Sequence, residues 1–154
     1  MYTRLAYLTA IIAAATLLPQ PSAAQDSAGV RAAALDYIEG FYTGDSTRLV
    51  RSVRPEVYKF GFWRHRDSTD YNPGSQMTWA GFHRYANDVK ARGGRGAPAN
   101  APKDVEIFEV LDKIASAKVT AWWGVDYLLM AKFDGRWMIT HVLWQTPPRL
   151  ADKH

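Results

Sequence analysis

Apolar residues in the first part of the chain recur at intervals of three or four positions, which predicts an amphipathic helix. The stripe of this helix consists of Val30, Ala34, Tyr37, Ile38 and Phe41. Gly44 follows the stripe, where a glycine commonly ends a helix.

Two further helices are expected, each with a capping residue before its apolar positions. Asp45 caps a short helix that turns Leu49, Val50 and Val53 inward, and Pro55 ends it. Thr78 caps a longer helix, whose stripe is Trp79, Phe82, Tyr85, Ala86 and Val89. The Gly- and Pro-rich stretch 91–102 after it reads as a loop.

The remaining apolar runs have the short period of β-strands. Strands are expected at 58–64 and 105–111, then at 114–133 as one long strand bent or bulged at Gly124, and finally at 136–145. Asp134-Gly135 is a strong hairpin signal between the last two. The order predicts an α+β fold in which a curved antiparallel β-sheet packs against three helices and leaves a conical cavity.

The first 24 residues have the three parts of a cleavable signal peptide. Arg4 is followed by an uncharged apolar run, Leu5 to Leu18, and then by small residues with a cut expected after Ala24. The run has 14 residues, fewer than the roughly 20 of a membrane-spanning helix, although an uncleaved anchor is the alternative. We expect one domain at 25–154, located in the periplasm or secreted, with no membrane contact after cleavage.

Composition removes several classes of function. The chain has no cysteine, which excludes thiolate metal sites and cysteine nucleophiles. The net charge is +4, or +3 without Arg4, too small an excess to indicate nucleic-acid binding. His65, Asp67, Asp70 and His83 fit no standard metal spacing. We therefore expect neither a metal nor a cofactor.

Four features together resemble the nuclear transport factor 2-like superfamily: the first helix, the turn Thr43-Gly44-Asp45, the Leu49/Val53 helix closed by Pro55, and the ending FDGRWMITHVLWQ. The stretch 119–145 is most similar to the bacterial group called putative lumazine-binding proteins. The resemblance implies a cone-shaped sheet that holds a small molecule, and a homodimer through the outer sheet face. The same scaffold serves isomerases, dehydratases, cyclases and non-catalytic binders.

Ketosteroid isomerases of this superfamily offer a residue-by-residue comparison. Their oxyanion-binding tyrosine matches Tyr37, eight residues before Asp45. Their general base, an aspartate, matches Gly61, and their protonated aspartate matches Leu129. Proton abstraction therefore has no base where that chemistry needs it.

The candidate catalytic residues are Tyr37, Asp126 and His141. Tyr37 is either a hydrogen-bond donor to a ligand or a core tyrosine with a backbone partner. His141 is either an acid/base group or a structural histidine, and it pairs with Asp126 only if the strand register allows. The expected ligand-binding residues are Tyr37, Phe41, Phe60, Trp79, Trp123 and His141. Strand alternation further predicts that Trp122 and Trp123 do not both face the cavity unless a bulge intervenes.

These observations favour an exported protein that binds a small apolar or ring-containing molecule in an aromatic-lined conical pocket, without catalysis of its own. The first alternative is an isomerase, dehydratase or cyclase that uses Tyr37 with His141 or Asp126. The second is a module that binds a partner protein through its sheet face.

Overall fold

The computed structural model describes residues 23–65 and 67–147. The predicted signal peptide lies outside the described residues except for Ala23 and Ala24, which begin the first helix. Within the described residues no helix is both long and apolar enough to cross a bilayer.

Three helices lie close to where the apolar stripes predict them, but Val50 is exposed rather than inward, and Val53 begins the strand that follows. α1 spans Ala23–Thr43 and buries its whole predicted stripe. α2 spans Ser46–Ser52, and the Asp45 side chain accepts a hydrogen bond from the Thr47 backbone N–H at 3.0 Å. α3 spans Trp79–Ala91 and is capped by Thr78. α2 ends at Ser52, before Pro55, because the chain becomes extended at Val53.

Six strands form one curved sheet in the order β2-β1-β6-β5-β4-β3. Their bounds are Val53–Phe62 (β1), Ser75–Met77 (β2), Asp104–Val110 (β3), Ile114–Ala121 (β4), Gly124–Phe133 (β5) and Arg136–Gln145 (β6). All neighbours are antiparallel except β1 and β6, which run parallel. The α+β curved sheet is therefore confirmed, but the sheet is mixed rather than wholly antiparallel.

The expected long strand 114–133 is wrong, because the chain reverses direction at Trp122 and Trp123. Residues on either side pair as an antiparallel hairpin, from Ala121 with Gly124 to Ile114 with Ala131. Gly124 has φ +140°, and a Cβ there would lie 2.0 Å from the Gln145 carbonyl oxygen. A glycine is needed at this position because the next strand's backbone passes so close.

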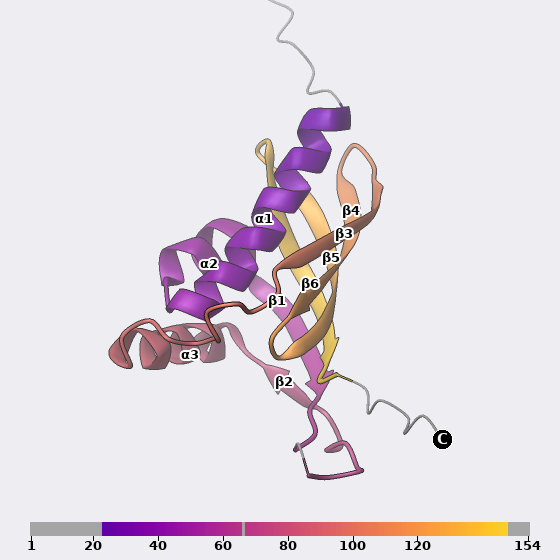
Figure 1. Ribbon diagram of the computed structural model, residues 1–154. Coiled ribbons are helices and arrows are strands. Elements are labelled where there is room, and N and C mark those ends of the chain that lie inside the picture. The colour runs from indigo at the N-terminus through magenta and orange to yellow at the C-terminus, as the bar shows by residue number, and fades with distance from the viewer. Residues whose placement is uncertain (1–22, 66, 148–154) are drawn as a thin grey trace, which may run out of the picture.

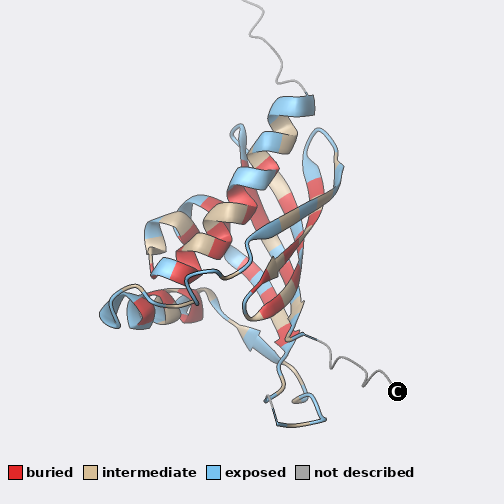
Figure 2. Cartoon of the chain, viewed as in Figure 1, coloured by how far each residue is buried: buried red, intermediate tan, exposed pale blue. Residues whose placement is uncertain are grey.

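α1 lies against one face of the sheet, and α2 and α3 pack around its C-terminal half (Figure 1). Figure 2 shows that buried residues concentrate between these helices and the sheet. The outer face carries exposed apolar side chains instead, among them Tyr58, Phe108, Tyr127, Leu129 and Leu143. The helices thus cover one face of the sheet and leave the other exposed. A cavity lies on the covered face.

Candidate ligand-binding cavity

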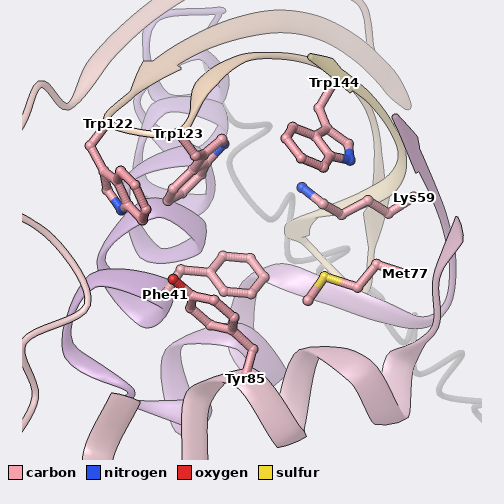
Figure 3. Close-up of a pocket in the computed structure, with 7 residues that line it drawn as sticks. All are labelled: Phe41, Lys59, Met77, Tyr85, Trp122, Trp123 and Trp144. Atoms are coloured by element: carbon pink, nitrogen blue, oxygen red, sulfur yellow. The ribbon is translucent and has the colours of Figure 1, made fainter. Parts of the chain in front are cut away.

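A cavity of about 170 Å³ lies where the strands β1 and β6, the β4–β5 turn and α3 meet. It is partly open to solvent, and almost all of its wall is apolar. The lining residues are Phe41, Lys59, Met77, Tyr85, Trp122, Trp123 and Trp144 (Figure 3). A site of this kind, concave and aromatic with few polar groups, is typical of small-molecule binding.

Both tryptophans of the β4–β5 turn face the cavity, contrary to the expectation from strand alternation. Alternation applies to extended strands, whereas Trp122 and Trp123 are turn residues. The Tyr42 hydroxyl accepts a hydrogen bond from the Trp122 backbone N–H at 2.9 Å and donates one to the Pro102 carbonyl at 2.6 Å. Tyr42 thereby ties the turn to the loop that precedes β3.

Lys59 is the charged residue of the cavity wall. It lies on the inner face of β1 between Val57 and Gly61, while Tyr58 and Phe60 point outward. Its side chain is 6% exposed. Its Nζ projects into the cavity between the rings of Trp123 and Trp144 (Figure 3).

A buried polar network holds the inner end of Lys59. Its Nζ donates to the Tyr37 hydroxyl oxygen at 2.5 Å and to Asp126 Oδ2 at 3.1 Å. The Tyr37 hydroxyl donates to the same carboxylate, and the Trp123 indole N–H donates to Asp126 Oδ1 at 2.8 Å. Asp126 is fully buried, so these three donors replace the water that a carboxylate otherwise requires.

Burial sets the direction in which the titratable groups of the network shift. It lowers the pKa of Lys59 below 10.5, against the opposing effect of Asp126. It raises the pKa of Tyr37 well above 10.0, and the neighbouring Asp126 carboxylate raises it further. Tyr37 therefore stays protonated and serves as a hydrogen-bond donor.

The ligand-binding residues named from the sequence lie in different parts of the structure, and only some of them line the cavity. Phe41 and Trp123 line the cavity, and Tyr37 lies behind its wall in the polar network with Asp126. Trp79 is half-buried and packs against Phe82 and His83 instead of lining the cavity.

Phe60 and His141 point to the outer face of the sheet, so they are not cavity residues. Phe60 stacks on Tyr58 at 6.3 Å between ring centroids. His141 is exposed and pairs in register with Tyr58 and Leu129, both outward-facing. The proposed pairing of His141 with Asp126 is wrong, since Asp126 lies opposite Trp144 and points inward.

The positions matched to ketosteroid isomerases are explained by the same geometry. A Cβ at Gly61 would lie 2.1 Å from Trp144 Cδ1, so the ring of Trp144 occupies the place of any side chain there. Leu129 is exposed on the outer face. The carboxylate that does meet Tyr37 is Asp126, three residues earlier on β5.

Sequence reasoning missed Lys59, Met77, Tyr85, Trp122 and Trp144 as cavity residues. The available signal for Lys59 was its place as the one charged residue at positions 58–63 of the expected aromatic strand. Since apolar side chains flank it on both faces, the pattern alone does not show which face is buried. Within the described residues no three His, Asp or Glu side chains gather in a way that would hold a metal ion.

Comparison with known proteins places this chain in a family. The family described as putative lumazine-binding matches residues 25–145. The chain belongs to this family. No curated protein sequence matches it.

Solved structures of the nuclear transport factor 2-like and cystatin-like kind share the fold. One is an NTF2-like protein of unknown function from Shewanella baltica OS155, with a TM-score of 0.63 and 20% identity, covering 84% of this chain and 99% of that one. Another is an NTF2-like protein of unknown function from Silicibacter pomeroyi DSS-3, with a TM-score of 0.58 and 19% identity, covering 81% of this chain and 98% of that one. A protein with a cystatin-like fold from Nostoc punctiforme PCC 73102 has a TM-score of 0.57 and 12% identity, covering 85% of this chain and 98% of that one. Identities this low establish the fold of this family member and nothing about its ligand.

Proposed function

We propose that this member of the putative lumazine-binding family binds a small molecule that carries a flat apolar ring, and that it does so without catalysing a reaction. The observation that carries the proposal is the aromatic cavity, whose wall includes three tryptophans together with Phe41 and Tyr85. An engineered apolar cavity of about 150 Å³ takes up benzene. A cavity of about 170 Å³ therefore admits one six-membered ring, with the rest of the ligand extending through the opening.

Binding of toluene, followed by tryptophan fluorescence, tests the proposal. We expect saturable quenching, because the ring would lie against Trp122, Trp123 and Trp144. Met77→Trp would fill the cavity and weaken binding at least about tenfold, a cost of about 1.4 kcal/mol. Val50→Trp, on the exposed part of α2, is the matched control. Equal affinity in the wild type and Met77→Trp, or no saturation in either, would contradict the proposal.

The enzyme alternative has less support than binding. It required Tyr37 together with His141 or Asp126 at a common ligand atom. Tyr37 and Asp126 contact each other, but neither lines the cavity, and His141 lies on the opposite face of the sheet. A general acid or base must come within hydrogen-bond reach of its substrate.

We also propose that the chain is exported to the periplasm or secreted, after cleavage behind Ala24. Support comes from Asp26, which contacts both Lys132 and Trp137 and would be the second residue of the mature chain. The cut would thus fall just before a residue that anchors α1 to the sheet. Intact-mass measurement of the protein from the periplasm or medium should give a chain that begins at Gln25. Recovery of only uncleaved chain from the cell interior would contradict it.

The outer sheet face is proposed to pair with a second copy of the chain. Tyr58, Tyr127, Leu129 and Leu143 are each about half exposed and lie on the adjacent strands β1, β6 and β5. A contiguous apolar face of this kind marks an interaction site. Light scattering should report a dimer for the wild type and for Val50→Lys, and a monomer for Leu143→Lys. A monomeric wild type at tens of micromolar would overturn this proposal.

A further inference from the structure

The ammonium group of Lys59 has one hydrogen atom that the protein does not use. An ammonium donates three hydrogen bonds, and two of them go to Tyr37 and Asp126. The third donor has no acceptor among the described residues. Lys59 also lines the cavity, as does Trp123, but the indole N–H of Trp123 is already bonded to Asp126. A ligand with an acceptor atom at this point would complete the hydrogen bonding of the ammonium, which favours its binding.

The groups around the Lys59 ammonium offset part of the cost of its burial and give the site a direction. Behind it, the Asp126 carboxylate accepts hydrogen bonds from Lys59, Tyr37 and Trp123. Around it, four aromatic rings have their centroids 5.2–5.9 Å from Nζ, within the range of cation–π attraction. The ion pair is therefore a dipole whose positive end faces the cavity.

The number of donors narrows the class of ligand. One N–H matches one acceptor atom, whereas a carboxylate or phosphate would place further charged oxygens against apolar rings, which is costly. The remaining hydroxyl of the wall belongs to Tyr85 on α3, and Figure 3 shows it on a different side of the cavity from Lys59. A negatively charged oxygen gains more from an ammonium than a neutral carbonyl does, because the hydrogen bond is then charge-assisted.

We propose that the cavity selects rings that carry a single ionised oxygen, such as a phenolate or a ring enolate, and that Lys59 Nζ donates its free hydrogen to that oxygen. This inference rests on the proposed binding function and adds the ligand class to it. The aromatic walls hold the ring, and the ammonium distinguishes an oxyanion from a neutral or cationic ring of the same shape.

The test uses para-nitrophenol, whose phenolate and phenol forms differ in absorbance. Titration of the bound probe with acid and base gives its pKa in the cavity. We expect the full-length wild type to bind the phenolate at least about tenfold more tightly than the phenol, which lowers the pKa of the bound probe by one unit or more. Lys59→Met should reverse the preference, since an apolar cavity favours the neutral form.

A double variant keeps the test decisive if Lys59→Met folds poorly, and a second lysine variant is the control. Lys59→Met combined with Asp126→Asn removes both charges and should also bind the neutral phenol preferentially. Lys132→Met, which changes a lysine remote from the cavity, should leave the preference of the wild type intact.

The outcomes separate this inference from the function on which it rests. A wild type that binds toluene and para-nitrophenol, but leaves the pKa of the bound probe unchanged or raises it, overturns the selection of oxyanions and leaves ring binding standing. A lowered pKa that persists in Lys59→Met also overturns the inference. Failure of the wild type to bind either ring overturns both proposals.

Discussion

Two lysine–aspartate pairs in this chain are built from the same parts at opposite ends of α1. In one, Lys59 pairs with Asp126, which also accepts a hydrogen bond from the Trp123 indole N–H. In the other, Lys132 pairs with Asp26, which accepts a hydrogen bond from the Trp137 indole N–H. Both pairs help to join the helix to the sheet, the first through Tyr37 and the second directly.

The pairs differ in what lies beside the lysine. The side chains of Lys59 and Asp126 are 6% and 0% exposed, and the ammonium faces an aromatic cavity. Those of Lys132 and Asp26 are 10% and 13% exposed and adjoin a surface hollow, whose lining also includes the charged residues Asp36, Arg51 and Arg136. The same chemistry therefore serves as a structural contact near the surface and as a cavity-facing charge in the interior.

The largest effect should come from removing one partner of the buried pair. Lys59→Met leaves Asp126 buried without its counter-charge and should lower the free energy of unfolding by about 3–5 kcal/mol. Combining it with Asp126→Leu removes both charges and should restore most of that loss. Urea unfolding measures both variants. A double variant as unstable as Lys59→Met would show that the network does not act as a charge pair.

Tyr37→Phe should have an intermediate effect. It removes one donor from Asp126 and one acceptor from Lys59 while the ring, packed 5.1 Å from that of Phe41 between centroids, remains. The free energy of unfolding should fall by about 1–3 kcal/mol. Tyr42→Phe, which affects the β4–β5 turn but not the charged pair, is the comparison. A Tyr37→Phe protein as stable as the wild type in urea would argue against the network.

The smallest effect on stability should come from the Lys132–Asp26 pair near the surface, and this effect should depend on pH. Hydrogen bonds from Lys132 and Trp137 lower the pKa of Asp26 below 3.8. Because the folded pKa lies below the unfolded value, the stabilisation is complete above about pH 3.8 and is lost as the pH falls through the folded pKa. Asp26→Asn should thus be less stable than the wild type at neutral pH, by less than Lys59→Met. Thermal unfolding should show the gap closing in acid, and a gap independent of pH would exclude this origin.

Local patterns were sufficient for most of the fold. The stripe of α1, the caps Asp45 and Thr78, and the turn at Asp134-Gly135 all depend on neighbours in sequence, and all lie where the sequence predicts them. The prediction of one long strand at 114–133 was wrong because strand-forming residues on both sides of a turn look like a continuous strand in sequence. Only the antiparallel pairing of β4 with β5 reveals that the chain reverses at Trp122 and Trp123.

The site was less accessible to such reasoning than the fold. Phe41 and Trp123 were identified, but Phe60 and His141 were assigned to the wrong face of their strands. On β1 and β6 apolar residues occupy both faces, so alternation carries no information about which face is buried.

The sequence by itself therefore determined the helices, the final hairpin turn and the α+β class, because these follow from periodicity and from the chemistry of caps and turns. Only the tertiary structure decided which face of each strand lies inside. It alone brought Tyr37, Lys59 and Asp126 together from α1, β1 and β5. Contacts between residues so far apart in the chain depend on strand register, which no short stretch of sequence encodes.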